Sequence, residues 1–379
     1  MGTLGVLGGG QLGLYFVIAA RSMGYETVVL DPDPEAPAGR VADTHLVAGY
    51  EDEAALLALA ERCDAVTVEF ENPAVSSLRF LEQRITVRPS SRAVAVGQDR
   101  RLEKSMCREL GLATAPFEVI ETDSDVRRVV AGGPTDQGRY VLKTARLGYD
   151  GRGQERIAAL DSLAGAWART GMVPCILESV VPLDAEFSVI VARDTTGNTA
   201  VYAPTQNTHV NGILDVSSAP YGGPAAGGLA VVDEGRRTAL LIAQHLEYVG
   251  VMAVEFFVSG GELLVNEMAP RPHNSGHWTM DAARTSQFDQ QVRALAGLPL
   301  GDTAMLFPAV SMVNILGDMW AAGEPGFGST APGQGTHIHL YGKSSPRSGR
   351  KMGHMTVTGD SIRDTESRAR QSRADAEPR

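Results

Sequence analysis

The sequence predicts an α/β fold followed by an α+β region, because three patterns succeed one another along its 379 residues. Residues 1–92 alternate apolar strand patterns with helical spacing, which is typical of parallel βαβ units. Two apolar runs then flank Ser259-Gly260-Gly261, which predicts an antiparallel hairpin. Short strand patterns resume after Pro299 and predict a small C-terminal β-rich domain.

The first region is expected to form a Rossmann-like domain over residues 1–92. Its elements are predicted in the order strand 4–7, helix 11–23, strand 27–30, helix 52–62 and strand 65–70. Asp31-Pro32 ends the second strand, and Arg88-Pro89-Ser90 marks the exit from the domain.

The middle region, residues 93–300, mixes helices with short strands. Apolar spacing and turn residues predict helix 99–110 closed by Gly111, strands 140–143, 175–177 and 187–192, helix 231–246, and a hairpin joining 251–258 to 262–267.

The C-terminal domain is expected to span residues 301–360. Its strands are predicted near 310–315, 337–341 and 355–357. The last segment, residues 361–379, is charged and nearly free of apolar side chains, so we expect a disordered tail.

Composition limits the possible partners and the compartment. The net charge of −11 argues against a general nucleic-acid binder, which normally needs a basic face. No apolar run is long enough to cross a bilayer, and the N-terminus begins directly with a strand rather than a secretion signal, so we expect a cytoplasmic protein. The three cysteines lie far apart and are expected to be buried thiols.

A first glycine-rich loop runs from Gly8 to Gly13 and satisfies the GxGxxG pattern after a predicted strand. With Asp31 ending the next strand, this context is that of a dinucleotide-binding fingerprint. Two other interpretations are a tight strand-to-helix turn that binds no dinucleotide, and a helix N-terminus that holds a substrate phosphate. We favour these two, because a more specific nucleotide site follows later in the chain.

The second glycine-rich loop, KTARLGYDGRGQ at 143–154, is more specific. Lys143 ends a strand and three glycines follow it, so the loop can close over a triphosphate with its amides and the lysine. No GKS or GKT closes the loop, which excludes a Walker A motif. A solvated lysine at the end of a strand is the alternative for Lys143 alone, and it leaves the rest of the segment unexplained.

Two carboxylates lie on opposite arms of the predicted hairpin. If the turn centres on Gly261, Glu255 and Glu267 are equally far from it and face each other. Opposed carboxylates repel, and a bound divalent cation removes this cost, because Mg²⁺ prefers oxygen ligands. Asn266 and Asn274 could add oxygen ligands. Two exposed strand glutamates are the alternative, which their apolar neighbours disfavour.

The segment after the hairpin, residues 269–279, carries too many polar side chains for a plain connector. Arg271, His273 and Asn274 could bind an anion beside the metal. His277 and Trp278 are interpreted as scaffold.

These segments resemble the ATP-grasp superfamily and, within it, the 5-(carboxyamino)imidazole ribonucleotide synthases of purine synthesis. The resemblance runs from residue 3 to about residue 358. It is carried by GGGQLG at 8–13, EFEN at 69–72, QDR at 98–100, KTARLGYDGRGQ at 143–154, NTHVNGIL at 207–214, NEMAPRPHNSGHWT at 266–279 and GRKMGH at 349–354.

The resemblance implies an ATP-grasp fold with a pre-ATP-grasp N-terminal domain and a lid subdomain at about 115–182. It implies two Mg²⁺ ions on Glu255 and Glu267, a bicarbonate or carboxyphosphate pocket at Arg271, His273 and Asn274, and a catalytic role for Lys143. The implied ATP contacts are Arg100, Lys143, Gly148, Tyr149, Asp150, Gly151, Arg152, Gly153, Gln154, Glu178, Ser179, Val180, Val181, Glu186, His209, Asn266 and Glu267. The implied ribonucleotide contacts are Glu69, Tyr149, Asp150, Arg152, Lys343, Arg350 and Lys351.

The implied reaction is carboxylation of 5-aminoimidazole ribonucleotide with ATP and bicarbonate by way of carboxyphosphate, in a homodimer. Two positions depart from the family pattern: Leu14 replaces the usual Arg, and Ser348 the usual Pro. Three rival functions stay open at this point. They are an ATP-grasp ligase for another acid, a nicotinamide oxidoreductase built on the first glycine loop, and a non-catalytic ATP-binding regulator.

Overall fold

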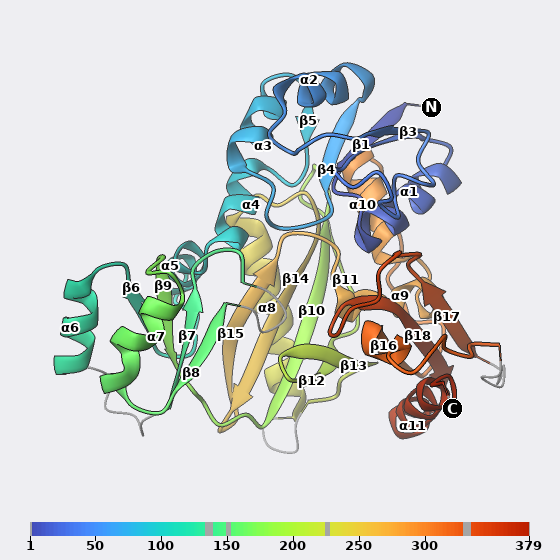
Figure 1. Cartoon of the computed structure of the whole chain (residues 1–379). Helices are drawn as coiled ribbons and strands as arrows, with labels where there is room; N and C mark the ends of the chain where they lie inside the picture. The colour runs from blue at the N-terminus through green and yellow to red at the C-terminus, as the bar shows by residue number, and fades with distance from the viewer. Residues whose placement is uncertain (1, 133–138, 149–152, 224–227, 329–334, 379) are drawn as a thin grey trace.

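The computed structural model describes residues 2–132, 139–148, 153–223, 228–328 and 335–378. The N-terminal region is a five-stranded parallel sheet in the order β3-β2-β1-β4-β5 (Figure 1). Its strands are β1 (Thr3–Leu7), β2 (Glu26–Leu30), β3 (Thr44–Leu46), β4 (Ala65–Val68) and β5 (Thr86–Val87), and the connecting helices are α1 (Gln11–Ser22), α2 (Glu53–Arg62) and α3 (Val75–Glu82). This sheet confirms the predicted Rossmann-like topology.

Two helices lead from this region into the next sheet. They are α4 (Ser91–Gln98) and α5 (Arg100–Glu109). The side chain of Asp99 caps α5 by accepting a hydrogen bond from the amide of Arg101, and Gly111 follows the helix with a φ of 68°. Residues 99–111 therefore form the helix and stop that the sequence predicts.

A separate antiparallel sheet of four strands projects to one side in Figure 1, in the order β6-β9-β7-β8. Its elements are β6 (Phe117–Ile120), α6 (Asp123–Gly132), β7 (Tyr140–Thr144), β8 (Gln154–Ile157), η1 (Leu160–Ser162), α7 (Leu163–Arg169) and β9 (Cys175–Ser179). Leu142 and Leu177 of the sheet pack against Trp167 of α7, which gives this sheet a core of its own.

The largest sheet has nine strands, and its main path is β15-β14-β10-β12-β13-β16-β18-β17 with β11 paired to β10. Its strands are β10 (Ala185–Arg193), β11 (Thr199–Val201), β12 (Thr205–Val210), β13 (Ile213–Ala219), β14 (Gly250–Ser259), β15 (Glu262–Ala269), β16 (Ala309–Leu316), β17 (Thr336–Leu340) and β18 (Lys351–Gly359). The C-terminal strands therefore extend the central sheet through the β13–β16 pairing and do not form a sheet of their own.

Helices fasten the central sheet to its neighbours. The remaining ones are α8 (Gly228–His245), η2 (Asn274–Gly276), α9 (Thr279–Ala282), α10 (Gln287–Ala296) and η3 (Gly317–Trp320). Buried Phe288 and Val292 of α10 share a core with Tyr15 and Phe16 of α1, so α10 joins the N-terminal region to the central sheet. None of the described helices is both long and apolar enough to cross a membrane.

The disordered tail predicted for residues 361–379 is wrong over its described part, because α11 spans Ile362–Asp375. Ser361 caps the helix, and Thr365 and Ala369 are buried. Ala369 packs in the core of β16 and β18. These few small residues are enough to pack the helix against the sheet because they share one face. Arg370 also bonds to Asp215 at 2.8 Å. Composition alone therefore missed the helix.

Candidate active site

The N-terminal region, the four-stranded sheet and the nine-stranded central sheet all contribute residues to one cavity of about 1360 Å³. The lining residues that the sequence predicts are Glu69, Arg100, Lys143, Gly148, Gln154, Glu178, Ser179, Val180, Val181, Glu186, His209, Glu255, Asn266, Glu267, Arg271, His273, Asn274, Lys343, Arg350 and Lys351. Gly153 instead lies in the β7–β8 connection, where its carbonyl accepts a hydrogen bond from the Thr144 amide at 2.8 Å. Tyr149, Asp150, Gly151 and Arg152 fall outside the described residues.

A β-bulge shapes the wall that carries the two predicted metal ligands. Ser259 pairs with Glu262, so the turn is centred between Gly260 and Gly261 rather than on Gly261. A regular ladder from this turn would set Glu255 opposite Asn266. The register instead shifts after Glu255, which pairs with Glu267. Because Asn266 is the extra residue, it and Glu267 both line the cavity although they are consecutive in sequence.

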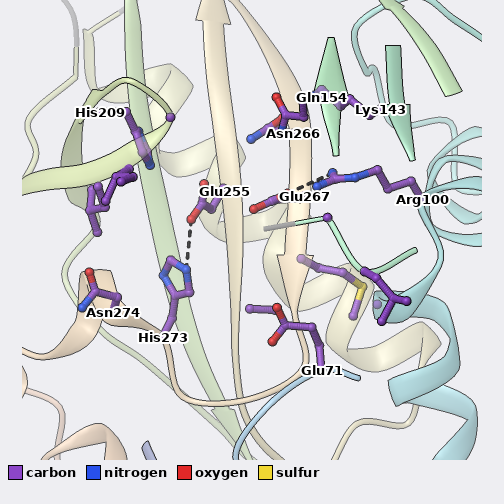
Figure 2. A pocket seen from close by; sticks show the side chains of 18 of the residues that line it. Glu71, Arg100, Lys143, Gln154, His209, Glu255, Asn266, Glu267, His273 and Asn274 are labelled. Carbon is purple, nitrogen blue, oxygen red and sulfur yellow. Dashed lines mark hydrogen bonds and ion pairs between the residues drawn. The ribbon is translucent and has the colours of Figure 1, made fainter. Parts of the chain in front are cut away.

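The two carboxylates have different partners (Figure 2). Oε2 of Glu267 lies 2.9 Å from Nη1 of Arg100, and Oε1 of Glu255 lies 3.1 Å from Nε2 of His273. Burial and the neighbouring charge of Glu267 raise the pKa of Glu255 to about 7. Burial acts on Glu267 as well, but Arg100 and Lys143 outweigh it and lower its pKa. Near pH 7 the pair therefore holds a proton that a divalent cation would displace.

This donor set fits Mg²⁺. Glu255 and Glu267 supply carboxylate oxygens from adjacent strands, and the side chain of Asn266 lines the same cavity. The raised pKa of Glu255 follows from burial and from the charge of Glu267, and a cation bound between the two carboxylates would oppose both effects. Glu255 and Glu267 would hold the ion, which supplies charge neutralisation at a triphosphate when bound.

Lys143 is the penultimate residue of β7 and is held by a buried acid. Its ammonium forms an ion pair with Glu178 on β9, whose other oxygen lies 2.9 Å from Nζ of Lys104 on α5. Burial opposes ionisation of Glu178, but the two lysines hold its pKa at about 2. Burial, aided by Arg100 and Lys104, lowers the pKa of Lys143. Glu178, which the resemblance assigns to ATP, thus orients Lys143 through its side chain.

Arg271 is positioned by a residue of the N-terminal region. Its Nε forms an ion pair with Glu71, which follows β4, and its Nη1 donates to the Pro272 carbonyl at 3.0 Å. Burial opposes ionisation of Glu71, yet Arg271 holds the pKa of Glu71 at about 2. The guanidinium is therefore fixed at the cavity wall, as an anion site requires.

His273 is held on both ring nitrogens. Nε2 faces Glu255, and Nδ1 lies 2.9 Å from Oγ of Ser275, which in turn lies 2.7 Å from Oγ of Ser188. Gln287 fixes the backbone, accepting from the amide of His273 at 2.9 Å and donating to its carbonyl at 2.8 Å. Burial and the charge of Arg271 move the pKa of His273 well below its ordinary range, so the imidazole is neutral at pH 7.

Asn274 forms a reciprocal amide pair with Asn314 of β16. Its Nδ2 donates to Asn314 at 3.1 Å and its Oδ1 accepts at 2.6 Å. The pair ties the segment after the hairpin to a C-terminal strand. Both asparagines are buried, and Asn274 lines the cavity beside His273.

Glu186 on β10 and His209 on β12 also line the cavity. His209 Nδ1 lies 2.6 Å from Glu186 Oε2. Burial acts to lower the pKa of His209, but Glu186 and the nearby Glu255 outweigh it and raise the pKa. Ser179, Val180 and Val181 line the cavity where β9 ends.

The first glycine-rich loop is filled by the chain's own carboxylates. Glu69 accepts hydrogen bonds from the amides of Gly10 at 2.8 Å, Leu12 at 3.1 Å and Gly13 at 2.9 Å. Asp31 accepts from the Gly9 amide at 2.7 Å. A pyrophosphate would need these same amides, so the loop is a tight βα turn capped by an acid.

Glu69 bonds to this loop, and Leu14 follows it directly in the sequence. Glu69 also lines the cavity, although both of its oxygens are bonded to the loop. Leu14 is buried in the core around α1, where it packs with Phe16 and Val17. The departure from Arg at this position is therefore accommodated by packing.

Lys343, Arg350 and Lys351 bring positive charge from the C-terminal strands to the cavity. Lys343 Nζ donates to the Lys351 carbonyl at 2.9 Å, and Arg350 Nη1 donates to the Ser345 carbonyl at 2.8 Å.

Asp318 ties down the loop between Lys343 and Arg350. Its carboxylate accepts from Oγ of Ser348 at 2.5 Å and from the Gly349 amide at 2.7 Å. Ser348, which departs from the family pattern, thus contributes a bond that a proline could not make.

Sequence reasoning missed the residues that orient the site: Glu71, Lys104, Gln287 and Asn314. Glu71 lies inside the EFEN motif, and Lys104 is buried on α5. A lysine at an apolar helical position is a signal that could have been used. Gln287 and Asn314 carry no comparable signal, because their partners are distant in sequence.

Three family models match consecutive parts of the chain. The ribonucleotide synthetase preATP-grasp domain matches residues 1–98, the ATP-grasp domain residues 105–288, and the phosphoribosylaminoimidazole carboxylase C-terminal domain residues 310–368.

The N5-carboxyaminoimidazole ribonucleotide synthase of Brucella melitensis is 42% identical over 93% of this chain and 95% of its own length. The Bacillus subtilis protein of the same name is 39% identical over 93% of this chain and 90% of its own.

Solved structures agree over the whole fold. The synthetase from Thermus thermophilus superposes with a TM-score of 0.87 at 40% identity, covering 98% of each chain. An Aspergillus clavatus synthase in complex with ADP and 5-aminoimidazole ribonucleotide has a TM-score of 0.88 at 26% identity, covering 100% of this chain and 99% of its own. The chain therefore belongs to the N5-carboxyaminoimidazole ribonucleotide synthase family of ATP-grasp ligases.

Proposed function

We propose that the protein carboxylates 5-aminoimidazole ribonucleotide with ATP and bicarbonate, giving N5-carboxyaminoimidazole ribonucleotide, ADP and phosphate in purine biosynthesis. One observation carries the proposal. The opposed pair Glu255 and Glu267 shares one cavity with Lys143, Arg271 and His273. This arrangement suits phosphoryl transfer to a small anion.

In the first step, a bicarbonate oxygen attacks the γ-phosphorus of ATP, and the bond from that phosphorus to the bridging oxygen of ADP breaks. Lys143 and Arg100 offset charge on the phosphoryl oxygens. Arg271, fixed by Glu71, binds the bicarbonate and then the carboxyphosphate. Asn274 and the neutral His273 complete this anion pocket.

In the second step, the exocyclic amine of the ribonucleotide attacks the carboxyl carbon, the bond from that carbon to the phosphate oxygen breaks, and the departing phosphate takes up the proton that the amine loses. The ribonucleotide phosphate is bound by the three basic residues of the C-terminal segment that line the cavity, Lys343, Arg350 and Lys351. Glu69 lies near Lys343, because the positive charge of Lys343 opposes the effect of burial on the pKa of Glu69. Tyr149, Asp150 and Arg152 are assigned to the same substrate.

The adenosine part of ATP is assigned to the region where the four-stranded sheet β6-β9-β7-β8 meets the central sheet. Ser179–Val181 offer backbone groups to the adenine, and Glu186 with His209 binds the ribose hydroxyls. We also propose a homodimer in the cytoplasm, which light scattering of the purified protein and cell fractionation would test.

The decisive experiment measures ADP release with 5-aminoimidazole ribonucleotide, with and without bicarbonate. The proposal requires turnover that depends on both compounds, together with formation of the carboxylated ribonucleotide. Turnover with formate or an amino acid in place of bicarbonate would favour another ATP-grasp ligase. Absence of turnover with every acid would favour a non-catalytic ATP-binding role.

A further inference from the structure

A second group of metal-binding side chains lies outside the cavity. Among the described residues, one cluster of at least three potential ligands stands out: Asp281, His339 and His354, whose ligand atoms all lie within 4.8 Å of one another. None of the three lines the proposed active-site cavity. They come from α9 and from the adjacent strands β17 and β18.

The strand register gathers the histidines on one face. His339 pairs directly with His354 across β17 and β18, and their rings lie 4.5 Å apart at an angle of 16°. His337 is two residues before His339 and therefore points to the same side of β17. Its Nδ1 lies 3.6 Å from Oδ1 of Asp281, while Nε2 of His339 lies 3.0 Å from Oδ2.

Asp281 and His339 bond to each other, whereas one ring nitrogen of His354 has no partner among the described residues. Its side chain is fully buried, and its Nε2 has no hydrogen-bond partner, while Nδ1 lies 3.0 Å from the hydroxyl of Tyr341. A buried nitrogen without a hydrogen-bond partner destabilises the fold, because it has lost its contact with water and gained nothing in exchange. A metal ion would remove this cost, because it accepts the lone pair of a neutral imidazole.

We propose that Asp281, His339 and His354, with His337 as fourth ligand, form a site for a divalent transition metal of the zinc class. Three imidazoles and one carboxylate are ligands that Zn²⁺ prefers, whereas Mg²⁺ prefers oxygen alone. Ligand atoms in a tetrahedral zinc site lie about 3.3 Å apart, so the cluster must contract. His337 is 43% exposed on an edge strand and has room to turn toward the others.

Such a site would be structural. It would fix α9, which follows the segment that carries Arg271, His273 and Asn274, to β17, which leads to Lys343, and to β18, which begins at Lys351. The metal would thus hold the proposed bicarbonate and ribonucleotide parts of the cavity in one arrangement. Binding of the metal depends on the geometry of this cluster and is independent of the proposed reaction.

The test is calorimetric titration of Zn²⁺ into the chelator-stripped full-length protein with excess Mg²⁺ present. We expect one Zn²⁺ per chain with micromolar or tighter affinity, and a higher melting temperature with Zn²⁺. His339→Gln and Asp281→Asn should each weaken binding by at least roughly 100-fold. Co²⁺ in place of Zn²⁺ should give the visible absorption bands of a four-coordinate ion in the wild type only.

Two control variants make the result decisive. His245→Gln, on α8, and His273→Gln, in the active-site cavity, should both retain the wild-type Zn²⁺ affinity. Circular dichroism of each variant checks that it is folded. The proposal is overturned if the wild type binds no Zn²⁺ at micromolar concentration. It is equally overturned if His273→Gln loses binding while His339→Gln keeps it, since the ion would then occupy the active site.

Discussion

Glu255 on β14 pairs directly with Glu267 on β15, although the Gly260-Gly261 turn by itself would set Glu255 opposite Asn266. The bulge at Asn266 has two consequences. It brings two carboxylates face to face, and it directs two consecutive side chains of β15 into the same cavity. Because Glu255 is buried there beside Glu267, its pKa is raised to about 7.

Replacing Glu267 by Gln should lower ADP release at least ~100-fold, because the phosphoryl-transfer site loses a charged metal ligand and the partner of Arg100. Steady-state kinetics at saturating Mg²⁺ would measure this. Glu61→Gln, an exposed change on α2, serves as the control. Activity of Glu267→Gln close to that of the wild type would rule out the metal-ligand role.

Binding of Mg²⁺ should release a proton near pH 7. The carboxyl of Glu255, with a pKa of about 7, is partly protonated there and must ionise to bind the cation. The apparent Mg²⁺ affinity should therefore fall as the pH drops below 7. Calorimetry in buffers of different ionisation enthalpy would detect the proton, and a heat independent of the buffer would contradict this account.

The same carboxyl should make the metal-free protein less stable at high pH. The pKa of Glu255 rises from 4.5 to about 7 on folding, so its contribution to stability is present below pH 4.5 and is lost as the pH rises through 7. At pH 8 without Mg²⁺, Glu255→Gln should unfold with a free energy roughly 1–3 kcal/mol higher than the wild type. Urea unfolding at pH 5 and pH 8 would show whether the difference between the two proteins grows with pH.

Glu71→Gln should impair use of bicarbonate while leaving ATP binding intact. Arg271 would lose its charged partner and its fixed orientation, so kcat/KM for bicarbonate should fall roughly 10- to 100-fold. The KM for ATP should stay near the wild-type value. An equal rise in both KM values would mean that Glu71 supports the fold rather than the position of Arg271.

Lys343→Ala or Arg350→Ala should raise the KM for ribonucleotide, whereas Arg363→Ala on α11 should not. Asp318→Ala, which removes two bonds to the 348–349 loop, should raise the same KM about 10-fold, and Ser348→Ala, which removes one, should raise it less. Initial rates with each substrate varied in turn would separate these effects. An equal rise in the KM for ATP would contradict the assignment of this loop to the ribonucleotide phosphate.

The sequence by itself determined the elements and much of the chemistry of the site. Strand and helix periodicity predicted the parallel N-terminal sheet, helix 99–110 and the hairpin, because burial of one face is written into local spacing. The lysine near the end of β7 and the two hairpin carboxylates were predicted as site residues from residue type and position alone, and the structure places all three in one cavity. Resemblance to a family then supplied the substrate.

Only the tertiary structure decided which partner each of these groups has. Glu71 and Arg271 are 200 residues apart, and Glu69 fills a loop more than 50 residues before it. The extension of the central sheet by β16 and the burial of α11 depend equally on distant segments. Such pairings are fixed by packing and charge across the whole molecule, and local periodicity carries no information about them.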